Sequence, residues 1–245
     1  MTEPTVENGS AIIAPLRSKT IERIGHIVWI GPHSPPQECI DSWPKLNPGI
    51  VWTVWRDHTK ALGWINQEQI DARAARQEWN GAADLCRLEI IARCGGIAVD
   101  ADSMAVKALE EGDFFLQETA VACFEHEQLR PGMVGCGFLG APQGHPFFRA
   151  CVEEASKQDP KELAAKTVGP GLMTRMAKAH PDMIKVYPAR SFNPKHHTGT
   201  AASGNYPIFA EQLWAGSRGY NALRKFPCQC LTCRNNTSML FCPWG

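Results

Sequence analysis

The chain has 245 residues, a length that suits one large domain or one domain with a tail. Its 25 basic and 25 acidic residues give a formal net charge of zero at pH 7, and 44% of its residues are hydrophobic. This balance argues against a protein that binds nucleic acid or an anionic membrane over a broad basic surface. The composition is that of a soluble globular domain.

Residues 1–20 are expected to form a flexible N-terminal arm rather than a targeting signal. The first ten residues are polar and acidic, with no basic segment followed by a long apolar one. No stretch of the sequence reaches the ~20 apolar residues of a membrane span. These features predict a cytoplasmic protein without a transmembrane segment.

The N-terminal half alternates predicted strands and helices. In chain order, hydrophobic patterning predicts a strand at residues 24–30, a helix at 39–46, a strand at 50–55, a helical region at 66–93 and a strand at 97–100. The helical region is expected to break at Asn80-Gly81, a pair that favours turns. Asp84 and Arg87 follow three residues apart, so one helix face carries both.

The C-terminal half continues this alternation. Patterning predicts strands at residues 121–125 and 133–140, helices at 146–157 and 171–179, a strand at 184–187 and a polar loop at 192–206. Residues 135–140 match G-x-G-x-x-G, but Ala141-Pro142-Gln143-Gly144 follow instead of the helix that a dinucleotide site requires. The alternation of strands and helices indicates an α/β fold.

Two carboxylates mark the end of the strand predicted at residues 97–100. Asp100 and Asp102 are one residue apart, so in extended backbone their side chains point to the same side of the sheet edge, where ligands of α/β folds bind. Like charges this close raise each other's pKa unless a cation lies between them. The pair predicts a hard divalent cation with a diphosphate on its far side, against the alternative of two solvated acids.

Four of the ten cysteines crowd the last eighteen residues, namely Cys228, Cys230, Cys233 and Cys242. Thiolates on tight turns can converge on one tetrahedral Zn²⁺. The tail at residues 226–245 is therefore a candidate structural zinc element, with free thiols or disulfides as alternatives. The other six cysteines are scattered through apolar runs and are expected to be small buried hydrophobic residues.

Four segments carry a family resemblance in the correct order and at suitable spacing. They are residues 24–31 (IGHIVWIG), 42–49 (SWPKLNPG), 82–87 (AADLCR) and 95–102 (GGIAVDAD). The segments resemble the DXD-containing glycosyltransferases that include the yeast initiation-specific α-1,6-mannosyltransferases and, more distantly, the large clostridial glucosylating toxins. The resemblance implies that residues 21–225 form a GT-A fold, an α/β architecture with a mixed central sheet flanked by helices.

The resemblance also implies roles by position. Trp29 is implied to lie near the nucleobase, Asp84 to bind the ribose or sugar, and Arg87 to bind the sugar or the diphosphate. Asp100 is implied to contact the ribose or sugar and the metal, while Asp102 coordinates the metal directly. The implied cofactors are Mn²⁺ or Mg²⁺ and a sugar donor linked to UDP or GDP. Arg87, Asp100 and Asp102 are the expected catalytic residues.

The C-terminal segment departs from the family pattern A-x-H-x-W-x-x-S-W. Residues 210–218 read AEQLWAGSR, so Gln212 replaces the histidine that helps to hold the metal, and Arg218 replaces the last tryptophan. An amide oxygen still ligates a hard cation, although it is neutral, so Gln212 is the third expected metal ligand. His196 or His197 is the alternative. Ser217 matches the pattern and is an expected donor-binding residue.

We therefore expect a metal-dependent, retaining hexosyltransferase whose acceptor is a glycan, a protein or a modified nucleic-acid base. Because Gln212 and Arg218 break the pattern, a non-catalytic protein that binds sugar nucleotides is the first alternative. A phosphatase of the haloacid dehalogenase type also has D-x-D after an apolar strand. Against that alternative, Met104 stands where the phosphatase motif has threonine or valine, and the only aspartates downstream, Asp113, Asp159 and Asp182, offer no acidic pair to hold Mg²⁺.

Overall fold

The structure is a computed structural model that describes residues 19–59 and 62–215. The cysteine-rich tail with its candidate zinc ligands lies outside the described residues, as do Ser217, Arg218 and nearly all of the expected N-terminal arm. The expected domain boundaries and the zinc element therefore stay predictions.

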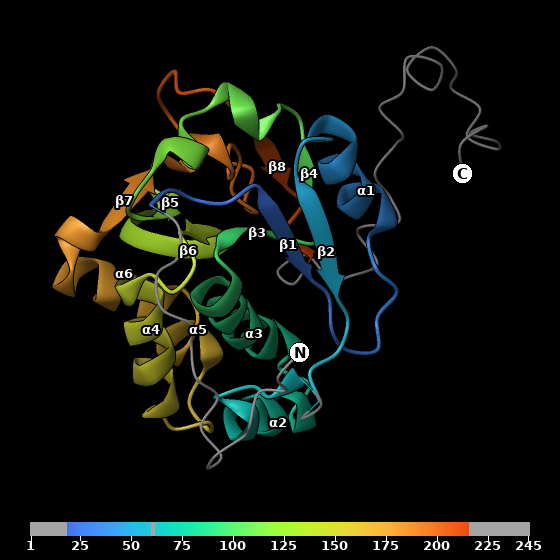
Figure 1. Cartoon of the computed structure of the whole chain (residues 1–245), viewed down its shortest axis with the longest axis vertical. Coiled ribbons are helices and arrows are strands. Elements are labelled where there is room, and N and C mark those ends of the chain that lie inside the picture. The colour runs from blue at the N-terminus through green and yellow to red at the C-terminus, as the bar shows by residue number, and fades with distance from the viewer. Residues whose placement is uncertain (1–18, 60–61, 216–245) are drawn as a thin grey trace, which may run out of the picture.

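A six-stranded mixed sheet forms the centre of the described part of the chain (Figure 1). Its strands are β1 (Ile24–Val28), β2 (Val51–Trp55), β3 (Gly96–Asp100), β5 (Ala120–His126), β6 (Arg130–Ala141) and β7 (Ile184–Tyr187). They lie in the order β2-β1-β3-β6-β5-β7. β1 runs parallel to β2 and β3, β6 runs antiparallel to β3 and β5, and β7 is parallel to β5.

Two layers cover the faces of this sheet (Figure 1). One layer consists of α2 (Gln67–Ala75), α3 (Trp79–Cys94), α4 (Pro146–Ser156), α5 (Ala164–Thr167) and α6 (Pro170–Ala179). The other contains α1 (Gln37–Leu46) and a small antiparallel sheet of β4 (Ser103–Ala105) and β8 (Ala210–Gln212). No helix within the described ranges is long and apolar enough to cross a membrane.

Alternate side chains of β3 pack into two separate hydrophobic clusters, one on each face of the sheet. Ala98 packs in the cluster that contains Leu88 of α3, whereas Ile97 and Val99 pack in the cluster that contains Trp43 of α1. Successive side chains of a strand point to opposite faces, and both faces of this sheet are covered. β3 is therefore apolar at every position until it reaches Asp100 at its carboxyl end.

All six predicted strands are present, with ends shifted by up to three residues. The strand predicted at 133–140 begins earlier, at Arg130, and contains the whole of residues 135–140. These glycines thus belong to an antiparallel strand and not to a dinucleotide-binding turn, as the sequence indicates. Three short elements, β4, α5 and β8, were not predicted, because three or four residues are too few to show a period.

The helical region predicted at 66–93 contains a break, but the predicted position at Asn80-Gly81 is wrong. α2 ends at Ala75 and α3 begins at Trp79, so the chain turns around Gln77, whose φ of 60° is left-handed. Gly81 lies inside α3, where a Cβ would collide with Ala164 of α5. Its small size serves the close approach of two helices rather than a turn.

Five of the six scattered cysteines are buried, as expected: Cys39, Cys86, Cys123, Cys136 and Cys151. Cys94 is half-buried. Burial raises the pKa of the Cys39 thiol to about 12, so this thiol stays protonated at neutral pH.

Candidate functional site

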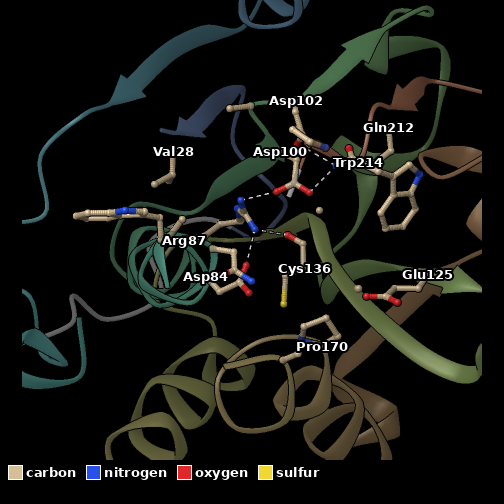
Figure 2. A pocket seen from close by; sticks show the side chains of 18 of the residues that line it. Val28, Asp84, Arg87, Asp100, Asp102, Glu125, Cys136, Pro170, Gln212 and Trp214 are labelled. Carbon is tan, nitrogen blue, oxygen red and sulfur yellow. Dashed lines mark hydrogen bonds and ion pairs between the residues drawn. The ribbon is translucent and has the colours of Figure 1, made fainter. Parts of the chain in front are cut away.

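A cavity of about 360 Å³ opens at the carboxyl ends of β1 and β3 (Figure 2). Its walls include Val28 from β1, Asp84 and Arg87 from α3, Asp100 from β3, Glu125 from β5 and Gln212 from β8. Ligands of open α/β sheets bind at this edge. The fold therefore gathers the charged residues of three distant sequence segments around one space.

Arg87 is the centre of the buried charge network. Its Nη1 donates to Asp84 Oδ1 at 2.9 Å and to the carbonyl oxygen of Cys136 at 2.8 Å, and its Nη2 donates to Asp100 Oδ1 at 2.5 Å. Only 4% of the Arg87 side chain is exposed. The guanidinium thus joins α3 to β3 and β6 while it compensates two carboxylates.

The two outer carboxylates of this network have shifted pKa values. Burial raises the pKa of Asp84 to about 7, although the adjacent Arg87 opposes the shift. Burial, with the nearby charge of Asp100, also raises the pKa of Asp102 to about 6. Removing a charge from water disfavours its ionised form. A cation bound beside either carboxylate would favour its ionised form and so oppose these shifts.

The Gln212 amide joins Asp100 to Asp102 (Figure 2). Gln212 Nε2 donates to Asp100 Oδ2 at 3.1 Å and to Asp102 Oδ1 at 2.9 Å. The backbone N–H of Ala215 donates to Asp102 Oδ2 at 2.6 Å. The pairing of β4 with β8, in which Ser103 faces Gln212, brings these segments together.

The donor set around this point fits a divalent cation. Asp100 Oδ2 and Asp102 Oδ1 converge on one atom, and carboxylate oxygens are ligands that Mg²⁺ and Mn²⁺ accept. The nitrogen and oxygen of an amide are assigned from hydrogen bonding. Rotating the Gln212 amide would present an oxygen to the same point. No group of three or more His, Cys, Asp and Glu side chains with metal-binding geometry occurs in the described ranges, so the amide would have to serve as the third protein ligand.

Trp29 and His26 have different environments, although they lie close together in sequence. Trp29 lines the cavity just after β1, and its Nε1 donates to the carbonyl oxygen of His33 at 2.9 Å. His26 is buried outside the cavity, where it contacts the Gly95 carbonyl at 3.0 Å and accepts a hydrogen bond from Trp55. Burial lowers its pKa to about 4. His26 is therefore a neutral packing residue that links strands.

The two loop histidines lie beside the cavity and not between the carboxylates. His197 lines the cavity, whereas His196 is buried against His126 and Trp214. Trp214 itself has a left-handed backbone with φ of 59°, and its Nε1 donates to the carbonyl oxygen of Lys195 at 2.8 Å. The residue that reaches both carboxylates is Gln212, not His196 or His197.

Sequence reasoning missed the wall that β5 and β6 contribute. Glu125, Arg130, Gly135 and Gly137 all line the cavity. Glu125 and Arg130 belong to no motif, and Gly135 and Gly137 occur only in the G-x-G-x-x-G match that the sequence analysis set aside. The pairing of β5 with β6 and of β6 with β3 decides the position of all four. The one local signal is the Gly-x-Gly spacing, since glycine inside a strand often marks a close approach of a ligand or backbone.

No family model matches the chain. A curated relative, the human alpha-1,4-N-acetylglucosaminyltransferase, is 28% identical over 122 residues, which cover 50% of this chain and 32% of that protein. The match thus spans about a third of the relative's length. It supports a relationship to glycosyltransferases at the level of sequence.

Solved structures match the fold over a larger part of the chain. The PaToxG glycosyltransferase has a TM-score of 0.54 at 16% identity, over 67% of this chain and 72% of that chain. The UDP-bound glycosyltransferase domain of the YGT toxin has a TM-score of 0.52 at 8% identity, over 69% and 80%. At such identities the likeness concerns the fold. The chain has the α/β glycosyltransferase fold of the GT-A type, with the mixed central sheet that its sequence predicts.

Proposed function

We propose that the protein is a glycosyltransferase that uses a nucleotide-sugar donor. The observation that carries this proposal is the buried network in which Arg87 joins Asp84 to Asp100 beside a further carboxylate, Asp102. Titratable groups with shifted pKa values in a cavity are typical of functional sites. The sequence relative and the fold neighbours, all glycosyltransferases, support the same class of reaction.

We propose a donor linked to uridine diphosphate, with the nucleobase near Trp29. One of the fold neighbours was solved with UDP bound. Trp29 offers an aromatic ring at the β1 end of the cavity, and Asp84 is the proposed contact of the ribose or sugar. Arg87 Nη2 uses one of its two hydrogens for Asp100 and retains a second for a phosphate oxygen. Ser217 stays a predicted donor contact outside the described residues.

Asp100, Asp102 and Gln212 are the proposed ligands of Mn²⁺ or Mg²⁺. When bound there, the cation would neutralise the charge that grows on the leaving diphosphate. Arg87 supports the same charge from the opposite side of Asp100 through its fixed guanidinium. We further propose retention of the anomeric configuration through attack of the acceptor on the face from which the diphosphate leaves. The acceptor class stays open among glycans, proteins and modified bases.

The test is a screen of UDP- and GDP-sugars for Mn²⁺-dependent hydrolysis, followed by acceptor trials with the best donor. Asp102→Asn is expected to lower turnover about 100- to 1000-fold, the usual cost of losing one group that stabilises charge in the transition state. Asp182→Asn makes the same chemical change at an exposed position and serves as the control. Full activity of Asp102→Asn would contradict the proposal.

One observation favours a second candidate, a protein that binds sugar nucleotides without turnover. Gln212 Nε2 already donates to both carboxylates and so occupies the position that a cation would take. UDP binding that is independent of Mn²⁺, together with no hydrolysis or transfer, would identify this candidate. The phosphatase alternative has no comparable support, because the curated relative and the fold neighbours reported above are glycosyltransferases.

A further inference from the structure

The cavity extends across four neighbouring strands, which lie in the order β1-β3-β6-β5. Trp29 follows β1, Asp100 ends β3, Gly135 and Gly137 lie on β6, and Glu125 lies on β5. Neighbouring strands are about 4.8 Å apart, so β1 and β5 are separated by about 14 Å. A nucleotide sugar whose base lies at β1 and whose diphosphate lies at β3 therefore carries its sugar over β6 toward β5.

Two glycines of β6 form the floor of the cavity between β3 and β5. Gly135 and Gly137 are two residues apart on β6, so they present the same face of the strand. A Cβ on Gly137 would lie 2.7 Å from Asp100 Oδ2, and a Cβ on Gly135 would lie 3.3 Å from Glu125 Cγ. The two glycines therefore let the side chains of Asp100 and Glu125 approach the β6 backbone, so that these acids face the cavity from opposite ends of the floor.

Glu125 closes the far end of this floor (Figure 2). Its side chain is only 12% exposed, and its Oε2 lies 3.3 Å from Arg130 Nη1. No residue in the described ranges donates a hydrogen bond to its Oε1. Burial raises the pKa of Glu125, with Asp100 acting in the same direction and Arg130 opposing. Oε1 remains accessible rather than fully buried, so this unused acceptor can bond a hydroxyl donor that enters the cavity.

We infer that Glu125 accepts a hydrogen bond from a hydroxyl group of the donor's sugar and thereby helps to select that sugar. The inference rests on the proposed function, because it needs the nucleotide to lie along β1 and β3. Asp84 and Arg87 would contact the sugar from α3, and Glu125 would contact it from β5, across the glycine floor. Glu125 would not touch the nucleobase or the ribose.

The test compares two affinities in each variant of the full chain, measured by calorimetry with Mn²⁺ present. One ligand is the sugar nucleotide that the wild type binds most tightly among UDP-glucose, UDP-galactose, UDP-N-acetylglucosamine and GDP-mannose. The other is the matching free diphosphate, UDP or GDP. Glu125→Gln is expected to lower the affinity for the sugar nucleotide about tenfold or more, the effect of losing a hydrogen bond to a charged group. The affinity for the free diphosphate is expected to stay within twofold of the wild type.

A second test variant and a matched control accompany Glu125→Gln. Gly135→Ala retains the carboxylate but adds a Cβ 3.3 Å from Glu125 Cγ, and it is expected to give the same selective loss. Glu153→Gln makes the matched change on exposed α4 and is expected to change neither affinity. Gly135→Ala supplies the result if Glu125→Gln does not fold, as judged from its melting temperature.

The outcomes separate the inference from the proposed function. If Glu125→Gln lowers the affinity for both ligands equally, its role is structural and the inference alone is overturned. Unchanged affinity for both ligands would also overturn the inference. If the wild type binds neither a diphosphate nor any of the sugar nucleotides, the proposed function itself is overturned, and the inference with it.

Discussion

The two walls of the cavity are built in different ways. In the N-terminal wall, Arg87 forms one ion pair with Asp84 inside α3 and a second with Asp100 at the end of β3. In the C-terminal wall, Asp102 is bound by neutral donors, the Gln212 amide and the backbone N–H of Ala215, which lie 110 and 113 residues further along the chain. The first wall is rigid and charged, whereas the second contributes hydrogen-bonding groups without charge.

The second wall also contains a strained residue. Trp214 lies between Gln212 and Ala215 with a left-handed φ of 59°, a conformation that costs a bulky residue about 1–3 kcal/mol. Its indole is held by Lys195 and lies 5.4 Å from the ring of His196. Such strain is typical of segments that rearrange when a ligand binds. The comparison therefore indicates a fixed donor wall and an adjustable opposite wall.

The largest effect is expected from breaking the charged wall. Arg87→Ala would leave Asp84 and Asp100 buried without their cation, which destabilises proteins by about 3–5 kcal/mol. The free energy of unfolding from urea titration measures this loss. Arg23→Ala removes an exposed pair with Glu110 and is expected to cost less than about 1 kcal/mol. Equal losses in the two variants would refute the rigid-wall interpretation.

A smaller effect is expected where the floor meets the charged wall. Gly137→Ala would place a Cβ 2.7 Å from Asp100 Oδ2, so Asp100 must shift away from Arg87 and Gln212. Forced repacking of this kind costs about 1–3 kcal/mol. We expect a lower melting temperature together with weaker UDP binding. Gly49→Ala, where the nearest atom is the flexible end of Glu110 at 3.3 Å, is the control and should leave both measurements unchanged.

The pH dependence of stability would sharpen the description of the charged wall. The folded-state pKa of Asp84, about 7 because of burial, lies above the ordinary value of 3.8. Between these values the folded chain holds a proton that the unfolded chain has lost, so the free energy of unfolding falls as pH rises from about 4 to 7. The slope is at most about 1.4 kcal/mol per pH unit. Asp84→Asn should flatten the curve measured by urea titration, and an identical curve would exclude this assignment.

The smallest effect on stability is expected at the adjustable wall. Gln212→His restores the residue type that the resemblance places there and removes the amide N–H group that donates to both carboxylates. We expect Mn²⁺ affinity to rise about tenfold, or about 1.4 kcal/mol, with the melting temperature nearly unchanged. Calorimetric titration with Mn²⁺ alone measures the affinity. A weaker affinity than in the wild type would mean that position 212 does not face the cation.

Local periodicity explains why the charged wall is visible in the sequence. Asp84 and Arg87 are three residues apart on one helix, so they share a face whatever surrounds them. Asp100 ends β3, whereas Asp102 lies in the turn that follows, so strand alternation does not explain why Gln212 reaches both carboxylates. The same reasoning failed for Gly81, because a packing contact with Ala164 and a turn both favour glycine. Only the packed structure distinguishes these two causes.

The sequence by itself determined the α/β alternation, the six strands of the central sheet and the two charged pairs, because these depend on residues close together in the chain. The resemblance already placed Gln212 with the two carboxylates, but only the tertiary structure distinguished it from His196 and His197 and placed Glu125 at the end of the same cavity. Those positions depend on the pairing of β4 with β8 and of β5 with β6. Such pairings are selected by the burial of two whole sheet faces, an energy that no short segment expresses.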